Sequence, residues 1–93
     1  MIRIIIRLIL RETHLVSFDH YQHELHNQLQ RASERGAKSI VVSAAELNLA
    51  VGGSSQFMES CFEALKAEIG PGDDVLVALD AGPGFSVRFT LPR

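Results

Sequence analysis

The residues best suited to metal chemistry are four histidines: His14, His20, His23 and His26. On a helix, positions three apart share a face, so His20 and His23 could hold a metal ion with Glu24 nearby. His26 is rotated towards the side of that helix, and no second group of Cys, His or carboxylate residues supplies further ligands. We therefore interpret the histidines as a solvated polar face and expect neither a metal nor another cofactor.

Two other features could support catalysis or ligand binding. The single cysteine, Cys61, lies on an apolar stripe between Phe57 and Leu65, which favours a core residue over a nucleophile. The segment Gly52-Gly53-Ser54-Ser55 precedes a predicted helix, where free N–H groups could bind an anion. It lacks a Walker lysine and a dinucleotide fingerprint, so a turn plus a helix cap is the simpler interpretation. No Ser, His and carboxylate are spaced as a triad, and we predict that the chain is not an enzyme.

The composition describes one small folded domain. The 93 residues are 46% hydrophobic and 22% charged, with a formal charge of -2 and a pI near 6.0. DNA-binding domains are usually basic, so this balance makes nucleic-acid binding less favoured. The lone cysteine fits a reducing compartment, and no segment approaches the roughly 20 apolar residues of a membrane span. We expect one cytoplasmic domain, residues 1–93, that does not act at a membrane.

The first elements predicted are a strand and a long helix. A strand over Ile2–Leu10, within residues 1–12, has Ile and Leu on one face. Its other face alternates arginine with isoleucine: Arg3, Ile5, Arg7, Ile9 and Arg11. Ser17 or Asp19 then caps a helix that ends at Arg35-Gly36. This helix carries an apolar stripe formed by Phe18, Tyr21, Leu25, Leu29 and Ala32.

Two further helices follow a short strand at Ile40-Val41-Val42. Ser43 and Glu46 form a capping box that opens a helix over residues 44–51, and Gly52-Gly53 stops it. Ser54 or Ser55 is predicted to cap the next helix, which ends before Gly70-Pro71-Gly72. The apolar positions of this helix, with Phe62 expected at the centre of the core, are Phe57, Met58, Cys61, Phe62, Leu65 and Ile69.

The C-terminal part is predicted to form a hairpin. Asp73-Asp74 is predicted to form a turn before a continuous apolar strand over Val75–Leu79. Residues 80–84 are of types that favour a turn. A half-buried antiparallel strand then alternates polar residues with Phe85, Val87, Phe89 and Leu91.

Over residues 17–91 this order of elements resembles the winged helix-turn-helix family. Glu46-Leu47 would open the first motif helix, Gly52 would lie at the turn, Ser54 would start the second helix, and Asp80–Gly84 would be the wing. The resemblance implies an α+β fold of three helices and a small antiparallel sheet, with the N-terminal strand as an addition. That strand could pair with the wing hairpin or with another chain. The alternative is an open α/β sheet with Ile2–Leu10 as its first strand.

In this family the second motif helix reads bases in the major groove. The positions that correspond to reading residues here are Ser55, Gln56, Glu59, Ser60 and Glu63. Gln56 could bond adenine and Glu59 could accept from cytosine, but the two carboxylates repel phosphates. Only Lys66 offsets them, and the wing contains Asp80 without a basic residue.

We therefore predict a non-enzymatic interaction module that acts through protein contacts or self-association. The alternative is a dimeric DNA-binding transcriptional regulator. Isoleucine on both faces of the first strand predicts a homodimer or a protein partner, with Ile5 and Ile9 and the flanking Arg3 and Arg7 at the contact.

Overall fold

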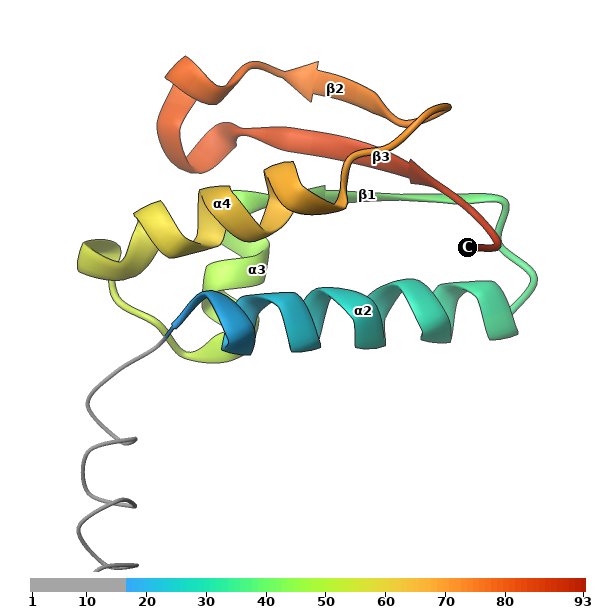
Figure 1. Ribbon diagram of the computed structural model, residues 1–93, viewed down its shortest axis with the longest axis horizontal. Helices are drawn as coiled ribbons and strands as arrows, with labels where there is room; N and C mark the ends of the chain where they lie inside the picture. Colours follow the sequence, from blue (N-terminus) through green and yellow to red (C-terminus); the bar gives the residue numbers. More distant parts are fainter. Residues whose placement is uncertain (1–16) are drawn as a thin grey trace, which may run out of the picture.

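The computed structural model describes residues 17–93, which form an α+β domain (Figure 1). The elements are α2 (Phe18–Glu34), β1 (Ser39–Ser43), α3 (Ala44–Val51), the 3₁₀ turn η1 (Ser55–Phe57), α4 (Met58–Glu68), β2 (Asp74–Val77), the 3₁₀ segment η2 (Leu79–Gly84) and β3 (Ser86–Thr90). The three strands form an antiparallel sheet in the order β1-β3-β2. The predicted strand over Ile2–Leu10, with its arginines, lies outside the described residues.

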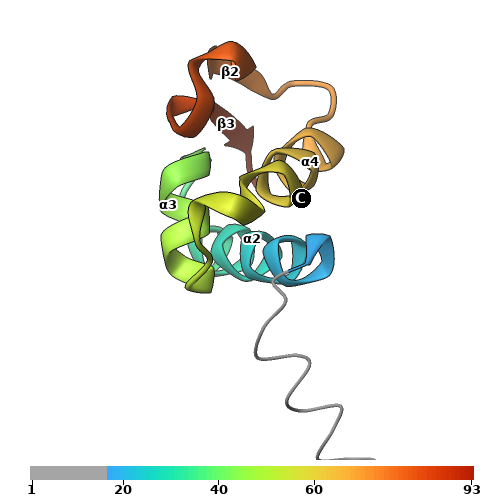
Figure 2. The same ribbon diagram turned by 90° about the vertical axis from the view of Figure 1, so that its left-hand side faces the viewer.

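The described helices pack on one face of the sheet. In the view along α2 (Figure 2), α3 lies on the left and α4 on the right of the domain. Both helices lie between α2 and the β2–β3 hairpin. Val42 pairs with Val87, and both are buried beneath the helices, whereas Val41 pairs with Arg88 on the outer face. All pairings between the described strands are antiparallel, as predicted for the small sheet.

Helix α2 begins and ends as the sequence predicts. Ser17 is its N-cap, and the Ser17 N–H donates to Nδ1 of His20 at 3.0 Å. The helix ends at Glu34, and Gly36 follows with a φ of 87°. Its buried residues are Tyr21, Leu25, Leu29 and Ala32, while Phe18 is partly buried at the edge of the core.

Helix α3 confirms the predicted capping box. The Glu46 N–H donates to Oγ of Ser43 at 3.1 Å, and the Ser43 N–H donates to Oε1 of Glu46 at 3.3 Å. The helix spans the predicted residues, ends at Val51 and is capped by Gly52, which has a φ of 82°. Two local signals, a capping box and a left-handed glycine, therefore set both ends of this helix.

The start of α4 differs from the prediction that Ser54 or Ser55 caps it. The Phe57 N–H donates to the Ser54 carbonyl at 3.0 Å, which closes the η1 turn, and α4 then begins at Met58. No side chain caps α4. The Asn48 amide donates to the carbonyls of Gly53 at 3.2 Å and Ser54 at 3.4 Å, so a side chain from α3 holds this segment in place of a local cap.

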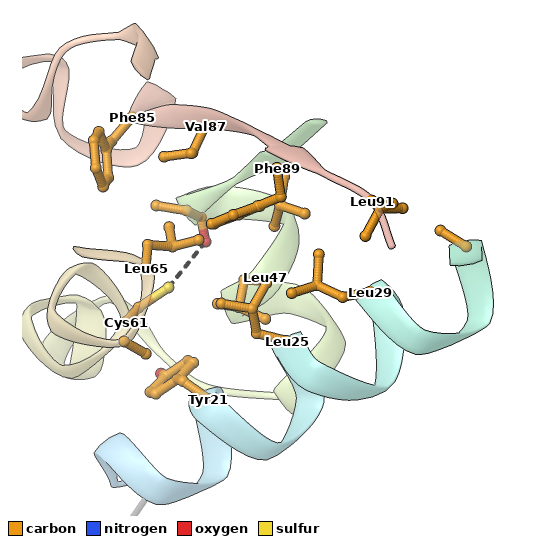
Figure 3. Close-up of a cluster of buried hydrophobic side chains, with 14 residues drawn as sticks. Tyr21, Leu25, Leu29, Leu47, Cys61, Leu65, Phe85, Val87, Phe89 and Leu91 are labelled. Carbon is orange, nitrogen blue, oxygen red and sulfur yellow. Dashed lines mark hydrogen bonds between the residues drawn. The ribbon is translucent and has the colours of Figure 1, made fainter. Parts of the chain in front are cut away.

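The face that α4 buries is also rotated from the predicted one. Cys61, Ala64 and Leu65 are fully buried, whereas Phe62 is only partly buried and meets Phe85 edge-on, with ring centroids 6.3 Å apart. The prediction that Phe62 occupies the centre of the core is therefore wrong. Cys61 points into the cluster of buried side chains (Figure 3), whereas Phe62 packs against Phe85, just before β3.

The two strands of the C-terminal hairpin differ in burial: β3 and its flanking residues contribute buried side chains, whereas β2 is exposed. Phe85, Val87, Phe89 and Leu91 are all buried, as the alternation predicts (Figure 3). The strand predicted over Val75–Leu79 instead spans Asp74–Val77, and every residue of it is exposed. The predicted wing residues, Asp80–Gly84, lie in η2, which kinks at Gly82 with a φ of 67°. Within residues 17–93, none of the helices has the length and apolarity needed to cross a membrane.

Candidate interaction surface

The residues that the resemblance assigns to base reading lie in η1 and the first turns of α4. Ser55 opens η1, Gln56, Glu59 and Glu63 are exposed, and Ser60 is half-buried. Glu59 and Glu63 are four positions apart, so they share one side of the helix. We call Gln56, Glu59 and Glu63 the acidic α4 face.

The charge around this face is negative. The Lys66 ammonium lies 3.1 Å from Oε2 of Glu63, and both side chains are about half-exposed. Such a surface pair contributes little stability, but it engages the basic group that could offset the carboxylates. Residues 17–93 contain six Lys and Arg against ten Asp and Glu, a formal charge of -4.

An apolar hollow of about 320 Å³ adjoins the first turn of α4. Leu49 of α3 projects beside it and is 81% exposed, the largest value among the exposed large hydrophobic residues. The hollow lies between α3, the start of α4 and η2, and its lining residues are Ala45, Asn48, Leu49, Gly53, Met58 and Pro83. We call it the Leu49 hollow. Met58 lines the hollow and Glu59 is the next residue of α4, so the hollow and the acidic α4 face both involve the first turn of this helix.

A partly buried polar contact holds the rim of the Leu49 hollow. The Tyr21 hydroxyl donates to Oδ1 of Asn48 at 2.5 Å, and the Asn48 amide donates to the Gly53 carbonyl. Burial, followed by the proximity of Cys61, raises the pKa of Tyr21, so its hydroxyl stays a donor. A side chain at Gly53 would collide with both Asn48 and Tyr21. The sequence identified Gly53 as a turn residue, but it gave no local signal for its contact with Tyr21.

The Gly52-Gly53 segment has no spare N–H groups for the anion considered from the sequence. The Gly53 N–H donates to the Asn48 carbonyl at 3.0 Å, and the Gly52 N–H donates to the Asn48 and Leu49 carbonyls. The turn-plus-cap interpretation of the glycine pair therefore agrees with the structure, although the serines after it do not cap α4.

Cys61 is a buried thiol rather than a reactive one. Its Sγ–H donates to the Ala44 carbonyl at 3.3 Å (Figure 3). Burial raises the pKa of this thiol to about 11, while a hydrogen bond from the Asn48 backbone acts in the opposite direction. Because the thiolate is the nucleophile, this environment suits a core residue.

Two of the histidines considered as metal ligands have other contacts, and His14 lies outside the described residues. His20 accepts the N-cap hydrogen bond of α2, and Nε2 of His26 lies 2.7 Å from Oε1 of Glu68. Glu24 accepts from Gln28 at 2.9 Å. Within residues 17–93, no three His, Cys, Asp or Glu side chains are grouped to hold a metal ion.

A second polar cluster, which sequence reasoning read only as a turn, ties the C-terminus to the body. Asp73 accepts from the N–H groups of Gly70 at 2.8 Å and Thr90 at 2.9 Å, and from Nη1 of Arg93 at 2.9 Å. Nε of Arg93 also donates to Glu68 at 3.0 Å. Burial opposes ionisation of Asp73, but the bonds from Arg93, Thr90 and Gly70 outweigh it and lower its pKa. This cluster stabilises the fold and lies apart from the acidic α4 face.

Comparison of the chain with protein-family models, with curated proteins and with solved structures found no match in any of the three. The acidic α4 face and the Leu49 hollow are therefore interpreted from their own chemistry.

Proposed function

We propose that this chain is a winged-helix-like interaction module that binds protein through the acidic α4 face and the Leu49 hollow. The observation that carries the proposal is the pairing of exposed carboxylates with an apolar hollow at the position where a DNA-reading helix would carry basic residues. Glu59 and Glu63 are exposed on α4, and Leu49, which lines the hollow at the first turn of α4, is 81% exposed.

The chemistry of this surface defines the partner it suits. An apolar side chain of the partner would occupy the Leu49 hollow and cover Leu49, which water now surrounds. Lys or Arg residues of the partner would face Glu59 and Glu63 across the edge of the contact, where opposite charges speed association and select the partner. The proposed partner is thus a protein with a basic surface around an apolar anchor.

Site-specific photo-crosslinking in cells tests this function. A photoreactive phenylalanine is placed at Leu49, at Glu63 and, as a control, at Gln30, which is exposed on α2. The proposal expects Leu49 and Glu63 to capture the same protein and Gln30 not to capture it. Reversing the charge with Glu59→Lys and Glu63→Lys should abolish capture from Leu49. Adducts to nucleic acid, or no adduct common to Leu49 and Glu63, would refute the proposal.

Binding of DNA by a dimer is the second candidate, and the arrangement of the elements favours it. In the structure, α3, a turn and α4 precede the β2–β3 hairpin, and this order of elements is the one on which the winged-helix resemblance rests. Fluorescence anisotropy with labelled duplex DNA at increasing salt separates the two candidates, because phosphate contacts weaken steeply with salt. If α4 faces DNA, Glu59→Gln and Glu63→Gln should tighten binding, whereas a protein-binding face gives no duplex binding in the wild type.

A further inference from the structure

Strand β2 exposes an apolar edge that lies apart from the acidic α4 face. Val75 is 50% exposed, Leu76 43% and Val77 42%, and Leu79, two residues after the strand, is 38% exposed. β2 is a terminal strand of the sheet, so among the described residues no strand pairs with its outer edge. An apolar edge with unpaired backbone groups is a template for another strand.

Each face of β2 carries a valine. Val75 pairs with Val87, which faces the helices, and Val77 pairs with Ser86 on the outer face, with an irregularity at Leu76 between them. Residues paired directly across a sheet point to the same face. A strand added at this edge would therefore meet apolar side chains on both of its own faces.

The chain contains one segment with that pattern outside the described residues. In a strand, the sequence of residues 2–10 would put isoleucine on both faces, with Ile4 and Ile6 on one and Ile5 and Ile9 on the other. The opposite edge of the sheet suits this segment less well, because Val41 is the single large hydrophobic residue of β1 that is counted as exposed.

Charge favours the same pairing. Residues 1–16 contain three arginines and one acid, Glu12, whereas residues 17–93 carry a formal charge of -4. Two carboxylates lie near the ends of β2: Asp74, its first residue, which is 63% exposed with Nη1 of Arg88 at 3.8 Å, and Asp80 just after the strand, which is also exposed. Arginines on an added strand would lie beside these carboxylates, and opposite charges across strands are favourable.

We propose that residues 2–10 of a second copy add to the β2 edge as a fourth strand, and that the exchange is reciprocal in a two-fold dimer. If residues 2–10 paired with β2 of their own chain, residues 11–16 would have to connect that strand to Ser17, and they span at most about 20 Å. A second copy does not need this connection. A path from Ser17 to β2 of the same chain would pass around the layer of α3 and α4 (Figure 2). Reciprocal exchange gives each β2 edge one partner and closes the assembly.

Two variants of the full chain separate this dimer from other assemblies. The edge variant, Val77→Lys, places a charge on β2, and the strand variant, Ile5→Glu with Ile9→Glu, alters the segment that would dock. Val41→Lys is the matched control, since Val41 is similarly exposed but lies on β1. Sedimentation equilibrium measures the mass against the 10.2 kDa chain, and far-UV circular dichroism confirms that each variant is folded.

We expect the wild type and Val41→Lys to dimerise, and each of the other two variants to dimerise at least tenfold more weakly. A mixture of the edge variant with an isotope-labelled strand variant should form a mixed dimer in native mass spectrometry. One intact strand and one intact β2 edge remain in that pair, so one of the two contacts can form.

Three results would overturn the proposal. A strand variant that still dimerises would indicate β2–β2 pairing or another interface, and an edge variant that still dimerises would exclude β2. A wild type that is monomeric at high micromolar concentration would exclude the exchange altogether. None of these results depends on the acidic α4 face, so this proposal and the proposed function fail separately.

Discussion

Replacing Asp73 by alanine should destabilise this domain more than replacing any of its exposed Asp or Glu residues by alanine. The Asp73 side chain is fully shielded from solvent and accepts three hydrogen bonds, from Gly70, Thr90 and Arg93. A hydrogen bond to a charged group contributes about 1.5–3 kcal/mol. Arg93 keeps Glu68 as a partner and water reaches Thr90, so we expect a total loss of about 2–4 kcal/mol for Asp73→Ala.

Asp74→Ala is the matched control for this prediction. The neighbouring carboxylate is 63% exposed and lies 3.8 Å from Nη1 of Arg88, so its loss should cost under about 0.5 kcal/mol. For a domain of this size, 1 kcal/mol lowers the melting temperature by roughly 4–8 °C. Asp73→Ala should therefore melt roughly 10–25 °C below the wild type, and Asp74→Ala only a few degrees below it.

The dependence on pH gives a second test of the same carboxylate. The pKa of Asp73 is lowered in the folded protein from its ordinary value of 3.8. Its contribution to stability is thus fully present above pH 3.8 and is lost as the pH falls through the folded pKa. Urea unfolding at neutral and acidic pH should show the gap between wild type and Asp73→Ala narrowing below pH 3.8. Equal losses for the two alanine variants at neutral pH, or a gap that stays constant in acid, would refute this reasoning.

Three further predictions concern α3 and its neighbours. Ser43→Ala removes the side-chain acceptor of the capping box and should cost about 0.5–2 kcal/mol in urea unfolding; an unchanged midpoint would contradict the cap. Gly53→Ala places a methyl group against Tyr21 and Asn48 and should cost about 1–3 kcal/mol, and a variant as stable as the wild type would show that this contact is loose. Cys61 should react with iodoacetamide at neutral pH only when urea unfolds the domain, because burial raises its pKa to about 11; rapid labelling of the native protein would disprove its burial.

Local signals account for the parts of the fold that the sequence predicts well. The Ser43 and Glu46 capping box and Gly52 set the ends of α3, because each acts within one helical turn. Alternation along residues 85–91 identifies the buried face of β3, since successive side chains of a strand point to opposite faces. The order of helices and strands follows from signals of this kind, and the structure has that order.

Long-range contacts account for the differences. Asn48 crosses from α3 to the carbonyls of Gly53 and Ser54, so α4 begins after a 3₁₀ turn rather than at a serine cap. The apolar stripe of α4 is wide enough to allow two orientations, and contact with the other helices buries Cys61 and Ala64 in preference to Phe62. A pattern of apolar residues gives the period of a helix but does not say which neighbour it meets.

The candidate surfaces likewise depend partly on local sequence signals and partly on long-range contacts. The sequence alone determined that Glu59 and Glu63 share a helix face and that this face is acidic, because helical spacing and charge are local properties. Only the tertiary structure decided that a hollow lies beside Leu49 and that β2 is an exposed edge strand. Both depend on residues far apart in the chain: Pro83 reaches α3 across the fold, and β3 inserts between β1 and β2. Burial and exposure depend on which elements become neighbours, and that is a property of the folded chain as a whole.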